Sequence, residues 1–168
     1  FMATAELLDD AADHLAAAEN PIVITRSAGR DPAAAAALTR IVELLGAPTF
    51  DPYPTHTNLD FDHPLRFASA PDAHLGDADV VLVVDSDVPW TPSRSAPRSD
   101  ATVITVGADP LFSQYPIRGF RTSVALSGST ASNLAALCDR LSSSGIDAVD
   151  QRTRRSERWT ALATEHRQ

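Results

Sequence analysis

The feature that most constrains the fold is a short apolar run in the middle of the chain. Val80–Val84 contains only Val and Leu, and it is followed directly by Asp85, Ser86 and Asp87. A β-branched run bounded by polar residues is typical of a strand buried on both faces, as in the middle of a parallel sheet. Because ligands of open α/β sheets bind beyond the carboxyl ends of such strands, we expect a functional site around Asp85.

Further short apolar runs alternate with segments whose apolar residues recur at helical spacing. Asp31 followed by Pro32 predicts a helix start, Gly46 predicts its end, and Thr4 and Ser129 are candidate N-caps of two more helices. The pattern indicates an α/β fold with a doubly wound, Rossmann-like parallel sheet of five to six strands, flanked by helices in three layers. The predicted strands are residues 22–25, 47–50, 80–84, 102–106 and, more weakly, 120–126; the predicted helices are residues 5–19, about 32–45, 130–141 and 147–168.

Changes in composition along the chain predict its domain organisation. Residues 1–4 are expected to be an N-terminal extension or an artificial addition, and residues 5–141 a single domain. Residues 142–168 form a Ser-rich linker and a polar, Arg-rich helix, which we expect to connect to a further domain because Trp159 and Leu162 are its main apolar positions. Residues 51–70 carry several prolines and little periodicity, which indicates a functional loop or short helices without a visible pattern.

The overall charge argues against two classes of partner. The chain has 22 Asp and Glu residues against 14 Arg, which gives a net charge of −8 and favours neither nucleic acid nor an anionic membrane surface as a partner.

The sequence contains no apolar run near the ~20 residues that are needed to cross a bilayer. The single Cys138 excludes an intrachain disulfide, lies on an apolar helical stripe where we expect it to be buried and inert, and favours a reducing, cytoplasmic location.

Several segments, taken in order, resemble the central domain of thiamine diphosphate-dependent enzymes of the acetolactate synthase and benzoylformate decarboxylase type. The turn at residues 85–90 (DSDVPW) is similar to an Asp-x-Asp-Val-Pro-Trp turn of acetolactate synthase-like proteins. The resemblance covers roughly residues 5–141. Its segments are residues 17–24 (AAENPIVI), 45–48 (LGAP), 63–67 (HPLRF), 78–84 (ADVVLVV) and 106–110 (VGADP).

The resemblance implies a six-stranded, Rossmann-like domain placed between two others. In such enzymes a pyrimidine-binding and a diphosphate-binding domain of the same chain hold thiamine diphosphate and Mg²⁺, and the full-length proteins are homo-oligomers. The Gly-Asp-Gly motif of the diphosphate-binding domain is absent from this sequence, as is the segment that carries the activating glutamate. We therefore expect this chain by itself to be catalytically silent. In some relatives the central domain also binds FAD or ADP.

Four residues at predicted strand ends are candidates for such a nucleotide site: Arg26, Ser27, Asp85 and Asp109. Arg26 and Ser27, with Arg30, precede a helix start and can hold an anion there. The alternative, which we favour, is that these arginines lie on the surface or contact the missing domains. Asp109 can bind a ribose hydroxyl or simply stabilise its turn. The turn after the first strand has one glycine, and carboxylates at the end of residues 80–84 repel a diphosphate unless a cation intervenes. These features weaken the case for FAD or ADP.

Three further interpretations stay open. Asp85 and Asp87 can chelate Mg²⁺ or cap backbone amides of their turn. Trp90 lies in a proline-rich turn, where it can cover the end of the sheet as a lid or contact another domain. We favour the contact with another domain. A cluster of potential metal ligands, more simply read as solvated loop residues, consists of His56, Asp60, Asp62 and His63. No catalytic residue and no metal ligand is assigned.

The sequence thus supports three hypotheses of different classes. The first is a non-catalytic central domain of a thiamine diphosphate-dependent lyase or carboligase, which supports domain assembly and retains a vestigial nucleotide site. The second is a stand-alone Rossmann-like module that binds FAD, ADP or NAD. The third is a small metal-dependent enzyme that uses Asp85 and Asp87.

Overall fold

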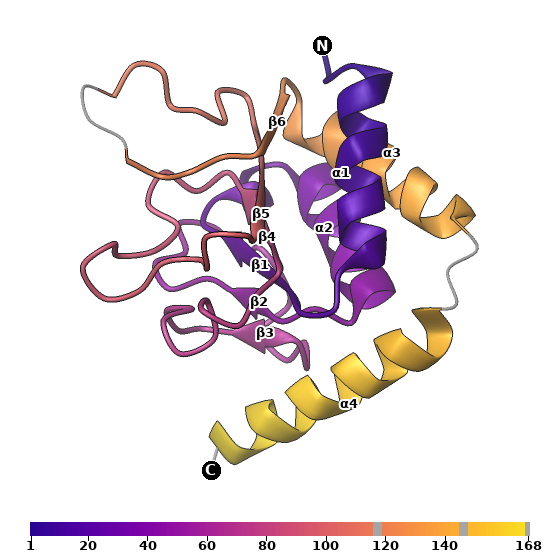
Figure 1. Ribbon diagram of the computed structural model, residues 1–168, viewed down its shortest axis with the longest axis vertical. Helices are drawn as coiled ribbons and strands as arrows, with labels where there is room; N and C mark the ends of the chain where they lie inside the picture. Colours follow the sequence, from indigo (N-terminus) through magenta and orange to yellow (C-terminus); the bar gives the residue numbers. More distant parts are fainter. Residues whose placement is uncertain (116–118, 145–147, 167–168) are drawn as a thin grey trace.

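Six parallel strands form a single sheet in the computed structural model, which describes residues 1–115, 119–144 and 148–166. Their order across the sheet is β3-β2-β1-β4-β5-β6 (Figure 1). The predicted Rossmann-like parallel sheet is therefore confirmed. The strands are β1 Pro21–Thr25, β2 Thr49–Phe50, β3 Arg66–Phe67, β4 Val80–Val84, β5 Thr102–Gly107 and β6 Val124–Ser127.

The apolar run Val80–Val84 forms β4, which lies at the centre of the sheet. β4 is paired along its whole length with β1 on one side and with β5 on the other, and all five of its residues are buried. Burying a Val or Leu side chain contributes roughly 1.5–3 kcal/mol relative to leaving it exposed. This strand is therefore a main contributor to the core.

Helices and connecting segments cover opposite faces of the sheet. In Figure 1 the helices α1, α2 and α3 pack together on one face, whereas the long connections between β4, β5 and β6 run over the other. A short 3₁₀ helix, η1 (Ala28–Arg30), precedes α2. The α-helices are α1 Ala5–Ala17, α2 Pro32–Leu45, α3 Thr130–Ser143 and α4 Ala148–His166.

Most of the predicted helix boundaries carry the expected caps. The Asp31 carboxylate accepts a hydrogen bond from Ala33 N at 2.9 Å, and Ser129 Oγ accepts one from Ser132 N at 3.2 Å. Gly46 ends α2 in the left-handed conformation, with φ of 60°. Thr4 is the N-cap residue of α1, but its side chain makes no capping hydrogen bond.

Two strand predictions differ from the structure. The weak strand predicted over residues 120–126 begins only at Val124, because Phe120 instead packs its ring edge-on against Trp90 with the ring centroids 5.1 Å apart. The segment expected to be irregular or helical contains β3, whose two residues pair with β2. An edge strand this short leaves no periodicity to detect.

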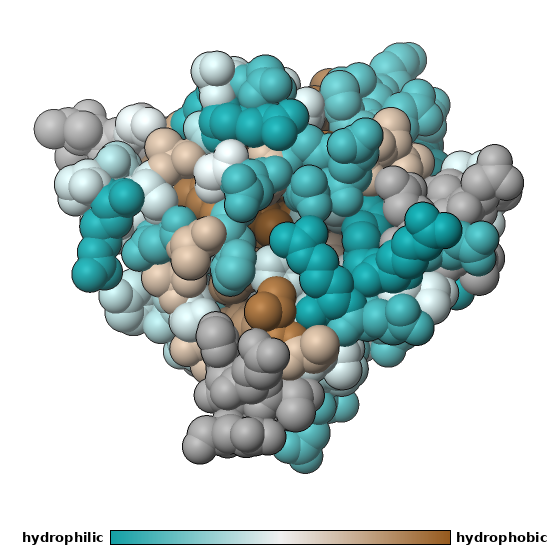
Figure 2. Space-filling view, turned by 60° about the horizontal axis from the view of Figure 1, so that its bottom comes forward, coloured by the Kyte–Doolittle hydropathy of each residue, from teal (hydrophilic) through white to brown (hydrophobic). Residues whose placement is uncertain are grey.

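The polar C-terminal helix packs against this domain. Trp159 is only 6% exposed, and its ring lies edge-on to Phe50 and Phe67 at the β2–β3 edge of the sheet. Arg155 donates a hydrogen bond to the carbonyl oxygen of Ala18 at 3.0 Å. Figure 2 shows this end of the molecule, where hydrophilic side chains surround a small number of apolar ones. Residues 145–147 and 167–168 of the predicted linker and helix lie outside the described residues, and the connection to a further domain stays a prediction.

The structure tests the expectations about Cys138 and about membrane-spanning segments. Cys138 is buried in α3, where its thiol donates to the carbonyl oxygen of Ala37 at 3.3 Å and burial raises its pKa. This agrees with an inert, structural cysteine. Within the described ranges, no helix combines the length and the apolar character needed to span a bilayer.

Candidate functional site

A cleft of about 290 Å³ opens at the carboxyl ends of β1, β4 and β5. All four predicted site residues, Arg26, Ser27, Asp85 and Asp109, line this cleft, because each follows a parallel strand that ends at the same edge of the sheet. Strand order reverses between β1 and β4, which is where open α/β sheets bind ligands. The structure therefore brings the four residues together, while their role in binding a cofactor stays a prediction.

Asp85 occupies the end of the central strand in a strained conformation. Its φ is 44°, in the left-handed region that non-glycine residues seldom adopt. Its amide donates to the carbonyl oxygen of Val106 at 3.0 Å, and its own carbonyl oxygen accepts a hydrogen bond from Ser27 Oγ at 3.0 Å. Burial raises the pKa of the Asp85 carboxyl, against the opposing effects of a hydrogen bond with Thr130 and the charge of Arg30.

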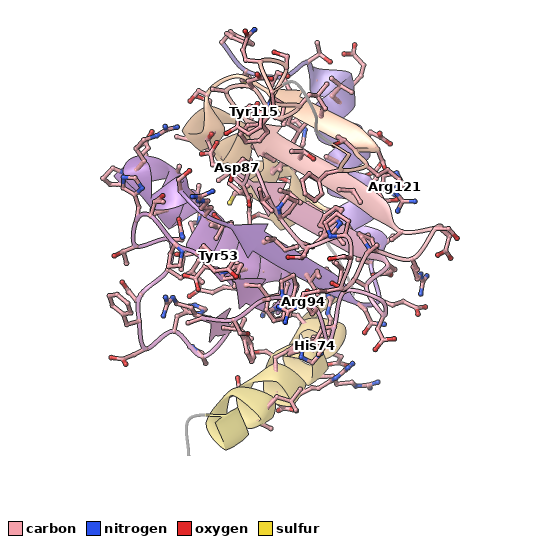
Figure 3. All side chains as sticks on the ribbon, turned by 90° about the vertical axis from the view of Figure 1, so that its left-hand side faces the viewer. Tyr53, His74, Asp87, Arg94, Tyr115 and Arg121 are labelled. Carbon is pink, nitrogen blue, oxygen red and sulfur yellow. The ribbon has the colours of Figure 1, made fainter. Side chains whose placement is uncertain are left out.

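The other carboxylate of this turn, Asp87, is bound to the turn after β1. Arg26 donates from a guanidinium nitrogen to Asp87 Oδ1 at 2.5 Å, and the Tyr115 hydroxyl donates to Oδ2 at 3.3 Å (Figure 3). Asp87 Oδ1 also accepts from Val88 N at 3.0 Å, so the capping interpretation is correct for this residue. Although burial opposes its ionisation, the hydrogen bond and charge of Arg26 together with backbone amides lower the pKa of Asp87.

Asp109 stabilises its own turn in this structure. Its Oδ2 accepts hydrogen bonds from the amide of Ser113 at 2.8 Å and from the Ser113 hydroxyl at 2.9 Å. These contacts hold the segment after β5 beside the cleft, where Phe112 adopts a φ of 49°. Asp85 and Phe112 are the only non-glycine residues with positive φ in the described part of the chain, and both line the cleft. Such strain is concentrated at functional sites in proteins.

The connection between β2 and β3 covers the turn after β1. Asn58, buried in the β2–β3 connection, accepts from Gly29 N at 3.0 Å and donates to the Arg26 carbonyl oxygen at 3.2 Å. Thr55 N donates to the same carbonyl oxygen at 3.1 Å. A Cβ atom at Gly29 would lie 1.9 Å from the Thr57 carbonyl oxygen, so only glycine fits under this segment. No sequence periodicity marks Thr55, Asn58 or Tyr115.

Trp90 does not have the role that was favoured from the sequence. Its side chain is 6% exposed and belongs to the hydrophobic core, where it packs against Phe120. The expectation that Trp90 contacts another domain is therefore wrong for this structure. The prolines beside it hold the turn in place, and an indole of this size stabilises most by burial within its own domain.

The candidate metal ligands do not come together. Across residues 1–115, 119–144 and 148–166, no group of three or more His, Cys, Asp or Glu side chains is placed to hold a metal ion. His56 Nδ1 lies 3.1 Å from the Thr55 hydroxyl, His63 Nε2 lies 3.6 Å from Glu43, and Asp87 is paired with Arg26. These residues therefore do not fit a resident Mg²⁺ site.

Comparison with known proteins places this architecture in a family. Residues 8–137 match the family model described as "Thiamine pyrophosphate enzyme, central domain". The chain belongs to this family. No curated protein matches the sequence significantly.

Two solved structures share the fold of this central domain. One is an enzyme from Mycobacterium smegmatis assigned as thiamin diphosphate-dependent, with a TM-score of 0.68, 23% identity and 82% of this chain covered. The other is benzoylformate decarboxylase from Polynucleobacter necessarius, with a TM-score of 0.66, 20% identity and 82% of this chain covered. The match spans only 28% and 27% of those chains, respectively. Further domains accompany the central domain in such enzymes.

Proposed function

We propose that this chain is the non-catalytic central domain of a thiamine diphosphate-dependent lyase or carboligase, of the acetolactate synthase-like type. The observation that carries the proposal is the family match over residues 8–137, which covers most of the chain. Thiamine diphosphate and Mg²⁺ would then be bound by a pyrimidine-binding and a diphosphate-binding domain of the same protein, a cytoplasmic homo-oligomer.

The surface of the carboxyl edge supports a role in domain assembly. Several large apolar side chains are exposed in the connections that follow β2, β4 and β5. Tyr53 and Phe61 are each 70% exposed, and Val88 and Leu111 are about half exposed. We infer that these loops contact the neighbouring domains and position them around the cofactor.

The coding sequence on either side of this segment tests the proposal. We expect it to encode a Gly-Asp-Gly motif followed by a distant Asn, and a segment with an activating glutamate, in the same open reading frame. A reading frame that ends directly after Gln168, with no partner domain encoded before Phe1, contradicts the proposal.

A stand-alone module that binds FAD, ADP or NAD is the second candidate. The position of the cleft at the switch point, lined by Arg26, Ser27, Asp85 and Asp109, favours it. A thermal-shift measurement with each nucleotide tests this function, because a ligand at a hundredfold excess over its Kd stabilises the folded state by about 2.7 kcal/mol. Absence of a shift with all three nucleotides argues against a nucleotide-binding module and leaves the central-domain proposal unaffected.

A further inference from the structure

Three consecutive amides of the turn after β1 already donate hydrogen bonds within the chain. In nucleotide-binding α/β folds, backbone N–H groups of this turn and the start of the next helix point at the phosphates. Here Gly29 N donates to Asn58 Oδ1 at 3.0 Å. The next two amides close the turn on itself: Arg30 N donates to the Ser27 carbonyl oxygen at 3.0 Å, and Asp31 N to that of Ala28 at 3.2 Å. A phosphate at this position would have to break these hydrogen bonds.

Carboxylates of the chain occupy the positions where an anion would bind. Asp31 caps the N-terminus of α2 through Ala33 N, so the positive end of that helix dipole already has an anionic partner. Thr130, the first residue of α3, and the charge of Arg30 both act on the Asp85 carboxyl and lower its pKa against the larger effect of burial. The Asp85 carboxylate also lies directly over Gly107, because a Cβ atom there would be 2.9 Å from Asp85 Oδ1.

The charges lining the cleft disfavour an anionic ligand. The carboxylates of Asp85, Asp87 and Asp109 outnumber the guanidinium groups of Arg26 and Arg30. Arg26 is paired with Asp87 at 2.5 Å, which leaves Arg30 as the cation that faces Asp85. A diphosphate would therefore meet an excess of like charge in a partly buried site, where such repulsion is weakly screened.

We infer that the cleft excludes phosphate-bearing ligands and that Asp85 is the residue that determines this specificity. The FAD or ADP that some relatives bind does not fit the residues present. The inference does not depend on the central-domain proposal, and it argues against the second candidate, a nucleotide-binding module.

Calorimetric titration of the 168-residue chain with ADP and with inorganic diphosphate tests the inference. The variants are Asp85→Asn, which removes the charge and keeps the size, and Asp85→Gly, which also suits the φ of 44°. Asp100→Asn makes the same change in net charge at an exposed residue beside the start of β5, at the opposite edge of the sheet. Each titration is run with EDTA and again with MgCl₂, because a bridging cation could reverse the repulsion.

We expect weak or undetectable binding of both probes by the wild-type chain and by Asp100→Asn. Both Asp85 variants should bind ADP about tenfold or more tightly than the wild type, since each 1.4 kcal/mol of repulsion removed is a factor of ten in affinity. Saturable wild-type binding that equals that of Asp85→Asn, in either buffer, overturns the inference. Absence of binding by every variant overturns the assignment of specificity to Asp85. Neither result affects the central-domain proposal, which the surrounding coding sequence tests.

Discussion

Asp85 combines an unusual backbone conformation with a partly buried carboxyl group. Asp and Asn tolerate the left-handed region better than most residues, because their short polar side chains can hydrogen-bond locally. The same position places the carboxylate against Gly107 and Thr130 at the end of the central strand. The cost of burying this charge gives the residue a measurable effect on stability.

The stability of the chain should depend on pH through Asp85. Burial raises its pKa in the folded state above the unfolded value, so the folded chain holds this proton more tightly and loses stability as pH rises from about 4 through the raised pKa. Asp85→Asn removes this loss, and it should therefore be more stable relative to wild type at about pH 7 than at about pH 4. Urea denaturation across this range measures the difference, with Asp100→Asn as the charge-matched control. If the difference in unfolding free energy between Asp85→Asn and the wild type does not change with pH, burial of the Asp85 charge is not the cause.

Arg66 and Asp51 form a buried ion pair at the β2–β3 edge of the sheet. Arg66 Nε donates to Asp51 Oδ2 at 3.0 Å, and the two side chains are only 10% and 2% exposed. Burial raises the pKa of Asp51, and the charge and hydrogen bond of Arg66 oppose this shift. Removing one partner of a buried ion pair costs about 3–5 kcal/mol, because the other charge is left without compensation.

Arg66→Met should therefore lower the free energy of unfolding at neutral pH by about 3 kcal/mol. The double variant Asp51→Asn/Arg66→Met should recover part of this loss, since no charge is then left buried. Chemical denaturation of both variants measures these energies. If Arg66→Met and the double variant are equally stable, the uncompensated charge of Asp51 is not the cause.

The residues of the cleft show what sequence alone can and cannot predict. Arg26, Ser27, Asp85 and Asp109 could be grouped because each follows a predicted strand, and parallel strands end at one edge. Asn58 and Tyr115 could not, because they lie in connections without periodicity. Their placement depends on tertiary hydrogen bonds, which have no local pattern.

Strands that are buried on both faces could be predicted from the sequence, whereas very short strands that pair over only a few residues could not. β4 was predictable because burial on both faces requires an unbroken apolar run. β3, with two residues, and the start of β6 depend on pairing with a neighbouring strand rather than on their own sequence. Trp90 was misassigned for a similar reason, since its burial depends on the distant Phe120.

The C-terminal helix α4 is docked on the domain mainly through Trp159. Trp159 packs against Phe50, Phe67 and His74, with ring centroids 4.8–6.3 Å away. Trp159→Ala should cost about 3–5 kcal/mol if the helix stays docked, because it leaves a large cavity at the sheet edge. If the helix detaches, its amides should instead lose protection from hydrogen exchange.

Both denaturant unfolding and hydrogen exchange of α4 measure this effect. Glu157→Ala, at an exposed position of the same helix, is the matched control and should change stability by less than about 0.5 kcal/mol. A Trp159→Ala variant with wild-type stability and wild-type protection would show that α4 does not contribute to the core of this domain.

At the scale of the whole molecule, we propose that this domain supplies a scaffold and leaves the chemistry to neighbouring domains. The cleft at the carboxyl edge of the sheet is lined by three carboxylates and two guanidinium groups. Thiamine diphosphate carries a negatively charged diphosphate, which this excess of carboxylates disfavours. The central claim is therefore that this chain needs other domains to bind the cofactor.

Calorimetric titration with thiamine diphosphate and Mg²⁺ tests this claim most directly. It should be made on the 168-residue chain and on the product of the complete reading frame that contains it. We predict no binding by the 168-residue chain and saturable binding by the longer product. Binding of the cofactor by the 168-residue chain alone, or no binding by the complete product, would contradict the account.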